Sequence, residues 1–170
     1  RALAPLLVRG SVVITDSRKK GRLRQATVIE RVAAPADQVL SAISAPRNYA
    51  KMVKSISDVT VHETTEEAID FSWTIGLSVF NLESRNRMRK VDKGVMIEGY
   101  EGDLAGSYWR WQLVPTGKNS TVVAYHSFAD VRKAAVILNK TVKREPYLEH
   151  GLLVGSNMVM LGAVRRRLEK

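Results

Sequence analysis

The strongest constraint on the fold is a two-residue alternation of apolar and polar side chains in the middle of the chain. In the stretch that begins at residue 69, every second residue is large and apolar: Ile69, Phe71, Trp73, Ile75 and Leu77. Successive side chains of a β-strand point to opposite faces, so this pattern predicts an antiparallel strand with one buried face. Comparable runs at 80–89, 94–100, 104–115 and 120–130 extend the prediction to an antiparallel meander.

The segments before this meander predict a hairpin and two short helices. Runs rich in β-branched residues at 11–15 and 23–33 flank a turn-rich loop that ends at Gly21, an arrangement typical of a β-hairpin. Pro35 and Pro46 then stand where the first turn of a helix tolerates proline. Apolar residues at helical spacing follow each proline, so we expect two short helices in tandem.

From Pro146 onward the periodicity is helical, and the apolar residues form two stripes. One stripe contains Tyr147, Val154, Met158, Leu161 and Leu168, and the other contains Leu148, Leu152 and Val159. A helix on one sheet needs a single apolar face, so the second stripe implies a further contact. Either a partner chain covers it, as in a homodimer, or it closes an apolar cavity. Glycines at 155 and 162 are unfavourable inside a helix and predict a close approach of backbone or ligand.

Composition excludes several kinds of site. The chain has 45% hydrophobic and 26% charged residues, which is typical of a globular protein, and it has no cysteine. Disulfides, thiolate zinc sites and cysteine nucleophiles are therefore excluded. The longest nearly apolar run, 152–164, is shorter than the roughly 20 residues of a transmembrane helix. We expect a soluble protein and favour the cytoplasm, although a chain that begins with Arg1 leaves a removed signal peptide or an upstream domain open.

The net charge of +10 is concentrated at the two ends of the chain. Residues 1–31 and 131–170 each carry a charge of +6, whereas residues 32–130 carry −2. The densest basic groups are Arg18, Lys19, Lys20 and Arg22, and then Arg165, Arg166 and Arg167. Such groups attract phosphate, although cations also favour helix C-termini without binding any ligand. We expect peripheral contact with an anionic membrane rather than with nucleic acid.

The three histidines predict no reactive centre. His62, His126 and His150 lie in no pattern typical of a metal site or a nucleophilic triad, so we assign no catalytic residue, metal or cofactor. His126 is in phase with Ala124 and opposite Tyr125. If Tyr125 faces a cavity, His126 points away from it and has a structural role.

The order of the elements, together with four short segments, resembles a known superfamily. The segments are Val32–Val39 with its Ala-Pro pair, Asn48-Tyr49, Glu101–Ser107 followed by Trp111, and Thr121–Tyr125. They resemble the START-like (SRPBCC) superfamily of polyketide cyclases/dehydrases and coenzyme Q-binding proteins over residues 23–170, with residues 1–22 as an N-terminal extension that holds an extra hairpin strand. The resemblance implies an α+β helix-grip fold, in which a curved antiparallel sheet wraps around a long C-terminal helix and two short helices follow the first strands.

The resemblance also implies an apolar ligand cavity between the sheet and the C-terminal helix. Its expected lining is Phe71, Trp73, Ile75, Phe80, Leu82, Ser84, Asn86, Met88, Trp109, Trp111, Tyr125, Val154, Asn157, Met158 and Leu161. Hydrogen bonds from Ser84, Asn86, Tyr125 and Asn157 would orient a ligand in this otherwise apolar wall. The alternative for Ser84 and Asn86 is that they lie past a bulge and face water.

Three functions fit these patterns. The first is a non-enzymatic carrier or sensor of a hydrophobic small molecule such as a lipid, a quinone or a polyketide. The second is an aromatase/cyclase-like enzyme, which needs polar residues that converge inside the cavity. The third is a basic module that binds ribosome or RNA. Arg85, Arg87 and Arg89 on one wet strand face favour it, whereas tryptophans in phase with aliphatic residues argue against a nucleic-acid-binding sheet.

Overall fold

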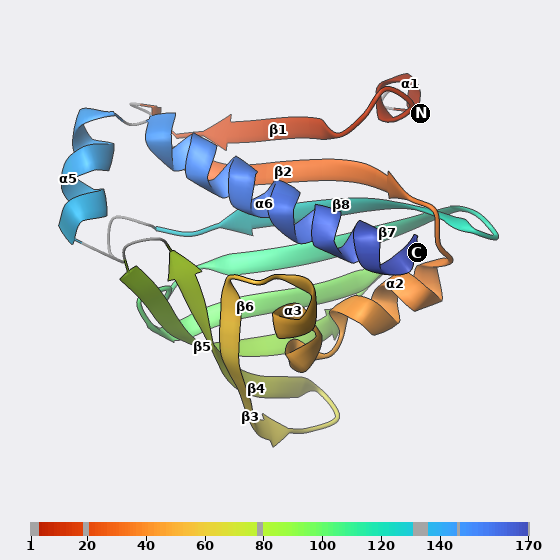
Figure 1. Ribbon diagram of the computed structural model, residues 1–170, viewed down its shortest axis with the longest axis horizontal. Helices are drawn as coiled ribbons and strands as arrows, with labels where there is room; N and C mark the ends of the chain where they lie inside the picture. Colours follow the sequence, from red (N-terminus) through yellow and green to blue (C-terminus); the bar gives the residue numbers. More distant parts are fainter. Residues whose placement is uncertain (1–3, 19–20, 78–79, 131–135, 146, 170) are drawn as a thin grey trace.

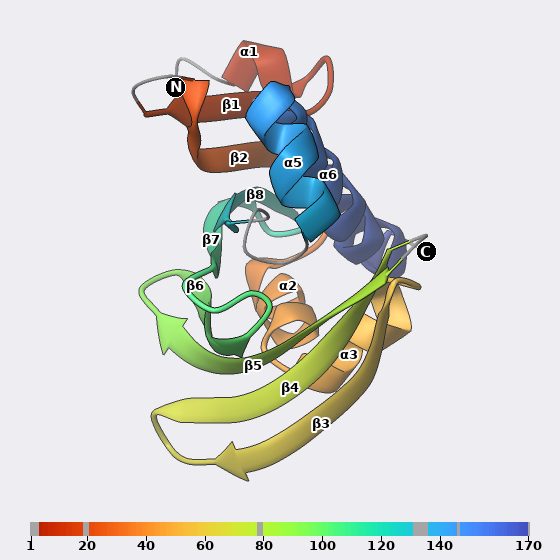
Figure 2. The same ribbon diagram turned by 90° about the vertical axis from the view of Figure 1, so that its left-hand side faces the viewer.

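One curved antiparallel sheet organises the part of the chain that the computed structural model describes, residues 4–18, 21–77, 80–130, 136–145 and 147–169. Its strands are β1 (Val12–Ser17), β2 (Leu23–Val32), β3 (Ile56–Thr64), β4 (Ala68–Leu77), β5 (Phe80–Val91), β6 (Gly94–Gly102), β7 (Tyr108–Gly117) and β8 (Ser120–Phe128). Their order across the sheet is β1-β2-β8-β7-β6-β5-β4-β3, and every neighbouring pair is antiparallel. Figure 2 shows how strongly the sheet curves from β1 to β3.

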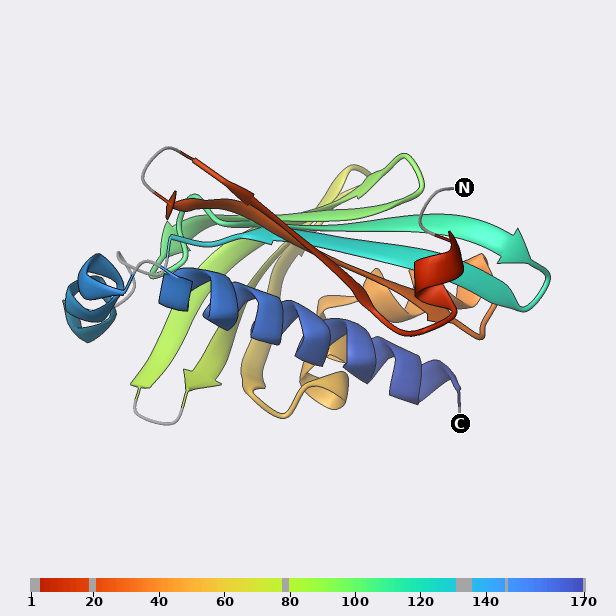
Figure 3. The same cartoon turned by 90° about the horizontal axis from the view of Figure 1, so that it is seen from above.

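A long helix crosses the concave side of this sheet. The helices are α1 (Ala4–Leu7), α2 (Ala36–Ile43), α3 (Pro46–Met52), α5 (Val136–Arg144) and α6 (Tyr147–Leu168). Helix α6 packs against β2 and β8, and α2 and α3 lie beside its C-terminal half (Figures 1 and 3). This arrangement confirms the predicted helix-grip fold. Within the described residues, no helix combines the length and the apolar character needed to cross a bilayer.

Prolines place the two short helices as predicted. Pro35 is the residue before α2, and Asp37 lies in the first turn, where a negative charge favours the helix dipole. Pro46 is the first residue of α3, where its missing N–H leaves no hydrogen bond unmade. The Tyr49 hydroxyl donates a 2.8 Å hydrogen bond to the Ile43 carbonyl oxygen and so joins the end of α2 to α3.

The core fills most of the space inside the sheet with aromatic rings. Its largest fully buried side chains include Trp73, Trp111, Tyr49, Tyr125 and Phe71. The Trp73 ring meets Tyr49, Phe71 and Trp109 edge to face, with ring centroids 5.8, 5.3 and 5.4 Å apart. Such edge-to-face contacts stabilise the core in addition to the burial of apolar area. The alternation that predicted β4 and β5 therefore describes an aromatic core as well as a sheet.

The start of β7 and the helices α1 and α5 differ from the sequence-based prediction. Strand β7 begins at Tyr108 rather than at 104, because the chain turns between Gly102 and Ser107 with a 3.2 Å Ala105 N–H bond to the Gly102 oxygen. Helix α5 was not predicted. It is short and ends in Lys143 and Arg144, and it packs against α6. The segment is amphipathic, so its sequence did contain a signal for a helix.

Candidate apolar ligand-binding site

A small apolar cavity lies between the sheet and the first half of α6. Its volume is about 130 Å³. Its described lining is Ile75, Leu77, Leu82, Leu104, Trp109, Ser127, Ala129, Leu152, Leu153 and Ser156. The polar side-chain groups in this set are the hydroxyls of Ser127 and Ser156 and the indole N–H of Trp109. Ligand pockets for drug-sized molecules occupy roughly 300–1,000 Å³, so a larger ligand would require the mouth to widen.

Strand register brings these residues together. Ile75 of β4 stands opposite Leu82 of β5, and Trp109 of β7 stands opposite Ser127 of β8. Each pair therefore points to the same, concave face of the sheet. Leu153 closes the cavity from the buried face of α6. The cavity thus combines residues from four strands and one helix that are far apart in the sequence.

The residues predicted to line a cavity fall into three groups. Ile75, Leu82 and Trp109 line the observed cavity. A second group is buried or half-buried on the same concave side but belongs to the packed interior: Phe71, Trp73, Phe80, Ser84, Asn86, Met88, Trp111, Tyr125, Val154, Asn157 and Leu161. Met158 forms the third group, because its side chain is 44% exposed. It is not among the residues that line the observed cavity.

Ser84 and Asn86 face the interior, so the alternative of a water-facing pair is wrong. The Trp73 indole N–H donates a 2.9 Å hydrogen bond to the Ser84 hydroxyl, which donates one of 3.2 Å to Asn86 Oδ1. The Asn86 amide donates a 3.0 Å hydrogen bond to the Ser84 carbonyl oxygen. Buried polar groups need such partners. These bonds satisfy the two side chains within the core, and neither residue lines the observed cavity.

Asn157 connects α6 to two strands. The Ser127 hydroxyl donates a 2.7 Å hydrogen bond to Asn157 Oδ1, and Asn157 Nδ2 donates one of 3.2 Å to the Ala26 carbonyl oxygen. Asn157 is buried. Because its amide already binds both strands, the side chain holds the helix in place at the edge of the cavity.

Two buried tyrosines lie deeper in the core. Tyr125 packs on Trp111 with ring centroids 4.1 Å apart. Burial raises the pKa of both Tyr49 and Tyr125 above the usual tyrosine value. Both hydroxyls are therefore neutral at physiological pH and can donate hydrogen bonds.

The second apolar stripe of α6 faces outward, because Leu148, Leu152 and Val159 are all exposed. Met158, from the first stripe, is exposed beside them. Leu152 also reaches the cavity mouth. No backbone approaches Gly155 within the described chain, because a Cβ there would meet no atom within 4 Å.

Several lining residues escaped the sequence analysis. Leu77, Ser127 and Ala129 share the phase of predicted residues on β4 and at the end of β8, so the alternation contained a signal for them. Leu153 lies on the buried face of α6, between the two apolar stripes seen in the sequence. Leu104 lies in the turn before β7, and only the tertiary structure brings it to the cavity.

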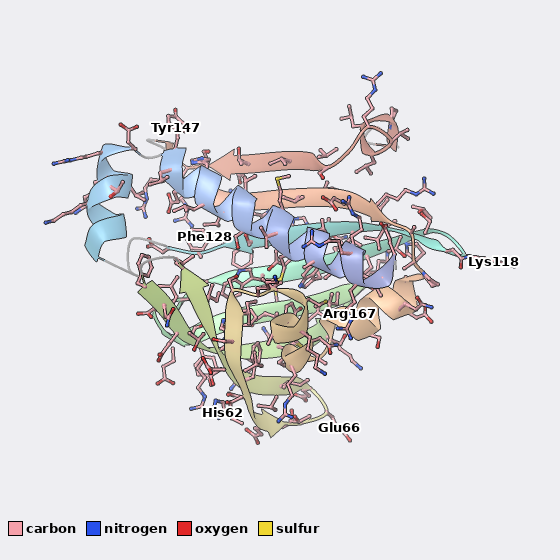
Figure 4. All side chains as sticks on the ribbon, in the orientation of Figure 1. His62, Glu66, Lys118, Phe128, Tyr147 and Arg167 are labelled. Carbon is pink, nitrogen blue, oxygen red and sulfur yellow. The ribbon has the colours of Figure 1, made fainter. Side chains whose placement is uncertain are left out.

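The histidines lie outside this cavity. His126 faces away from it, as predicted, and its Nδ1 lies 2.9 Å from the Thr27 hydroxyl. Burial, with a smaller contribution from Arg110, lowers the pKa of His126. His62 lies within β3, on the side of the molecule remote from α6 (Figure 4). His150 Nε2 lies 2.9 Å from the Ser17 hydroxyl. Among the described residues, no three His, Cys, Asp or Glu side chains could hold a metal ion.

The predicted basic surface consists of two separate parts. Arg18 lies over the Phe128 ring, and Arg22 lies 4.0 Å from Asp130. Lys19 and Lys20 lie outside the described residues. At the other end of the chain, Arg165 binds Glu30 at 3.3 Å. Arg166 and Arg167 are exposed at the end of α6.

The convex face of the sheet holds a polar network. Asp70 accepts hydrogen bonds from the Tyr100 hydroxyl at 2.5 Å and from Arg85 Nε at 3.0 Å, and Arg87 lies 3.9 Å away. Burial raises the pKa of this carboxyl, but these hydrogen bonds and the two positive charges outweigh it and hold the pKa below its usual value. Arg89 pairs with Glu98. A groove of about 470 Å³ nearby is lined by Thr60, Ser72, Glu83, Arg85 and Glu101 among others, and is mainly polar.

The sequence identifies the family of this chain. Residues 32–145 match the family described as polyketide cyclase/dehydrase and lipid transport, and this match covers more than half of the chain. The protein therefore belongs to that family. No curated protein sequence is significantly similar to the chain.

Solved structures of the same fold have little sequence identity to this chain. A protein from Thermus thermophilus has a TM-score of 0.72 at 14% identity, over 85% of this chain and 96% of that one. A STAR-related lipid transfer protein from Xanthomonas axonopodis has a TM-score of 0.65 at 16% identity, over 95% and 99%. The Zhui aromatase/cyclase from a Streptomyces species has a TM-score of 0.62 at 15% identity, over 85% and 94%. Similarity at these identities establishes the shared fold alone.

Proposed function

We propose that this protein binds and carries a hydrophobic small molecule between the sheet and α6. The apolar cavity is the observation that carries the proposal. Its walls are aliphatic and aromatic, with Ser127 and Ser156 as hydrogen-bonding groups. Apolar surroundings with a few placed polar groups suit a lipid, a quinone or a polyketide-like molecule. One structural relative is described as a lipid transfer protein, which agrees with a carrier.

The same lining favours carriage over catalysis. A cyclase moves protons, and general acid–base catalysis needs a titratable group within hydrogen-bond reach of the substrate. The ten described lining residues include no titratable side chain. The buried tyrosines and the Ser84–Asn86 pair lie in the packed interior instead. We therefore place an aromatase/cyclase-like activity second to binding.

Native mass spectrometry of the full chain with palmitic acid or a decyl-chain benzoquinone tests the proposal. We expect a one-to-one adduct and a higher melting temperature. Ala129→Phe fills part of the cavity and should abolish the adduct. Ala124→Phe is the matched control, because Ala124 lies in β8, the strand that ends one residue before Ala129, and faces the convex side.

A second cavity variant guards against misfolding. Ser156→Phe adds a ring at an exposed position of the cavity mouth, where the fold has space for it. Loss of binding in Ser156→Phe with an unchanged circular dichroism spectrum would support the proposal. A folded wild-type chain that binds neither probe, and that yields no apolar molecule on organic extraction from its native host, would overturn it. Conversion of a poly-β-keto substrate would make the cyclase the better function.

A further inference from the structure

We propose that the exposed face of α6 docks on an anionic lipid membrane. This surface, the α6 stripe, consists of Tyr147, Leu148, Leu152, Met158 and Val159, with the exposed glycines 151 and 155 between them. Tyr147 is 75% exposed and Val159 is 54% exposed. The inference goes beyond the proposed ligand and does not depend on it.

The α6 stripe is uncharged along its length. Between Tyr147 and Val164, the one acidic residue is Glu149, which lies on the opposite, buried face of the helix. His150 bonds to Ser17 on the side toward β1. The exposed face therefore presents apolar side chains and glycine to the surroundings for most of its length. An apolar helix face of this kind lies in the interface between lipid headgroups and acyl chains.

Both ends of the stripe are cationic. Lys143 and Arg144 are exposed in the last turn of α5, a few residues before Tyr147, and Glu145 is the acidic residue between them and the stripe. At the far end, the Arg166 side chain lies over Gly162, where an added Cβ would be 3.3 Å from Nη1. Figure 4 shows Tyr147 and Arg167 at opposite ends of α6. An anionic lipid surface matches this distribution, because lysine and arginine near it are attracted to its headgroups.

The charges favour a membrane over a second copy of the chain. If two α6 stripes packed together, parallel pairing would place Arg166 beside its own counterpart. Antiparallel pairing would place it beside Lys143 and Arg144 of the other copy. Like charges meet in both arrangements, and such juxtapositions oppose binding. Anionic lipid neutralises both ends at once.

The α6 stripe also adjoins the cavity. Leu152 belongs to the stripe and lines the cavity, and Ser156, one turn further along the helix, lines the same mouth. A helix resting on a bilayer through this face would therefore bring the cavity mouth to the acyl-chain region.

Vesicle flotation of the full chain tests the docking surface. The vesicles contain phosphatidylcholine alone or phosphatidylcholine with about 30 mol% phosphatidylglycerol. The second mixture represents an anionic membrane leaflet. Wild-type protein should bind the anionic vesicles at least about tenfold more tightly than the neutral ones, and salt should weaken this binding. Val159→Glu should reduce binding at least about tenfold, because it places a charge in the apolar contact. Val114→Glu is the matched control, since Val114 is 46% exposed on β7 and lies away from α6.

Charge variants separate the electrostatic contribution. Arg166→Gln/Arg167→Gln should weaken binding to anionic vesicles roughly fivefold per arginine. Lys51→Gln/Lys54→Gln, near α3, should leave it unchanged. In vesicle-free solution, all these variants should match wild type in their circular dichroism spectra and in their binding of palmitic acid or the benzoquinone. These two measurements distinguish a loss of docking from a loss of ligand binding. The proposal is overturned if wild type does not bind vesicles, if Val159→Glu binds as well as Val114→Glu, or if light scattering shows a dimer that Val159→Glu dissociates.

Discussion

Hydropathy alone does not distinguish the two faces of α6. The buried face holds Glu149 and Asn157 among its apolar residues, whereas the exposed face holds Leu148, Met158 and Val159. Each polar group on the buried face has a partner: the Leu23 N–H lies 3.4 Å from Glu149 Oε2, and Asn157 binds β2 and β8.

The difference shows that two physical effects position this helix. On the buried face, apolar packing and hydrogen bonds to the strands act together, and the hydrogen bonds offset the cost of burying polar groups. On the exposed face, neither effect operates within this chain. An apolar face that is exposed to water is typical of an interaction surface. The docking proposal is based on this property.

The largest expected effect comes from the centre of the buried face. Leu161 is fully buried in α6. Leu161→Ala should lower the free energy of unfolding by about 3 kcal/mol, because it removes apolar burial and leaves a cavity. Urea denaturation measures this loss. Leu148→Ala, at an exposed position on the same helix, is the control and should cost less than about 1 kcal/mol. An equal loss of unfolding free energy in the two variants would mean that both faces of α6 are buried to the same extent.

Loss of the polar anchor should have the next largest effect. Asn157→Ala leaves the Ser127 hydroxyl and the Ala26 carbonyl oxygen without their partner on α6. We expect the free energy of unfolding to fall by about 2 kcal/mol. A double-mutant cycle with Ser127→Ala should give a coupling energy of about 1 kcal/mol. Additive losses would show that the hydrogen bond does not stabilise the helix position.

Asp70 extends the comparison to a buried charge on the sheet. Its pKa is lowered in the folded state, so its ionised form stabilises the fold above the unfolded-state pKa of about 4, and this stabilisation is lost as the pH falls through the lowered pKa. Asp70→Asn should cost about 1 kcal/mol at pH 7, because Arg85 and Arg87 are half exposed and screened by water.

Thermal unfolding at several pH values measures this difference. The gap between wild type and Asp70→Asn should narrow as the pH falls below about 4. The control is Asp92→Asn, in the exposed turn between β5 and β6, where asparagine suits the turn equally well. A gap that is constant with pH would mean that the Asp70 charge contributes nothing.

The smallest effect on stability belongs to the exposed face. Val159→Ser should change the free energy of unfolding by less than about 0.5 kcal/mol, because surface substitutions away from packed features are usually neutral. The same variant should still weaken vesicle binding. A large loss of stability in vesicle-free solution would indicate that Val159 is covered by a second copy of the chain.

Much of the fold followed from local patterns. The alternation at 69–77 predicted β4, and Pro35 and Pro46 predicted the positions of α2 and α3. The alternation along the strands was sufficient to predict that Ile75, Leu82 and Trp109 line the cavity, because a strand shows its buried face in its own sequence. Met158 of α6 was predicted in the same way but is not among the residues that line the observed cavity. The helix is apolar on two sides, so periodicity could not indicate which side is buried.

The sequence by itself determined which residues alternate along each strand, where the helices begin and which family the chain belongs to, since these depend on local geometry and on short motifs. Only the tertiary structure decided which side of α6 meets the sheet. Hydrogen bonds between Asn157 and two distant strands hold that side against the sheet, together with the apolar packing of the same face. The tertiary structure also determined the cavity, because Leu104, Ser127 and Leu152 come together only when β8 and α6 pack over the turn before β7.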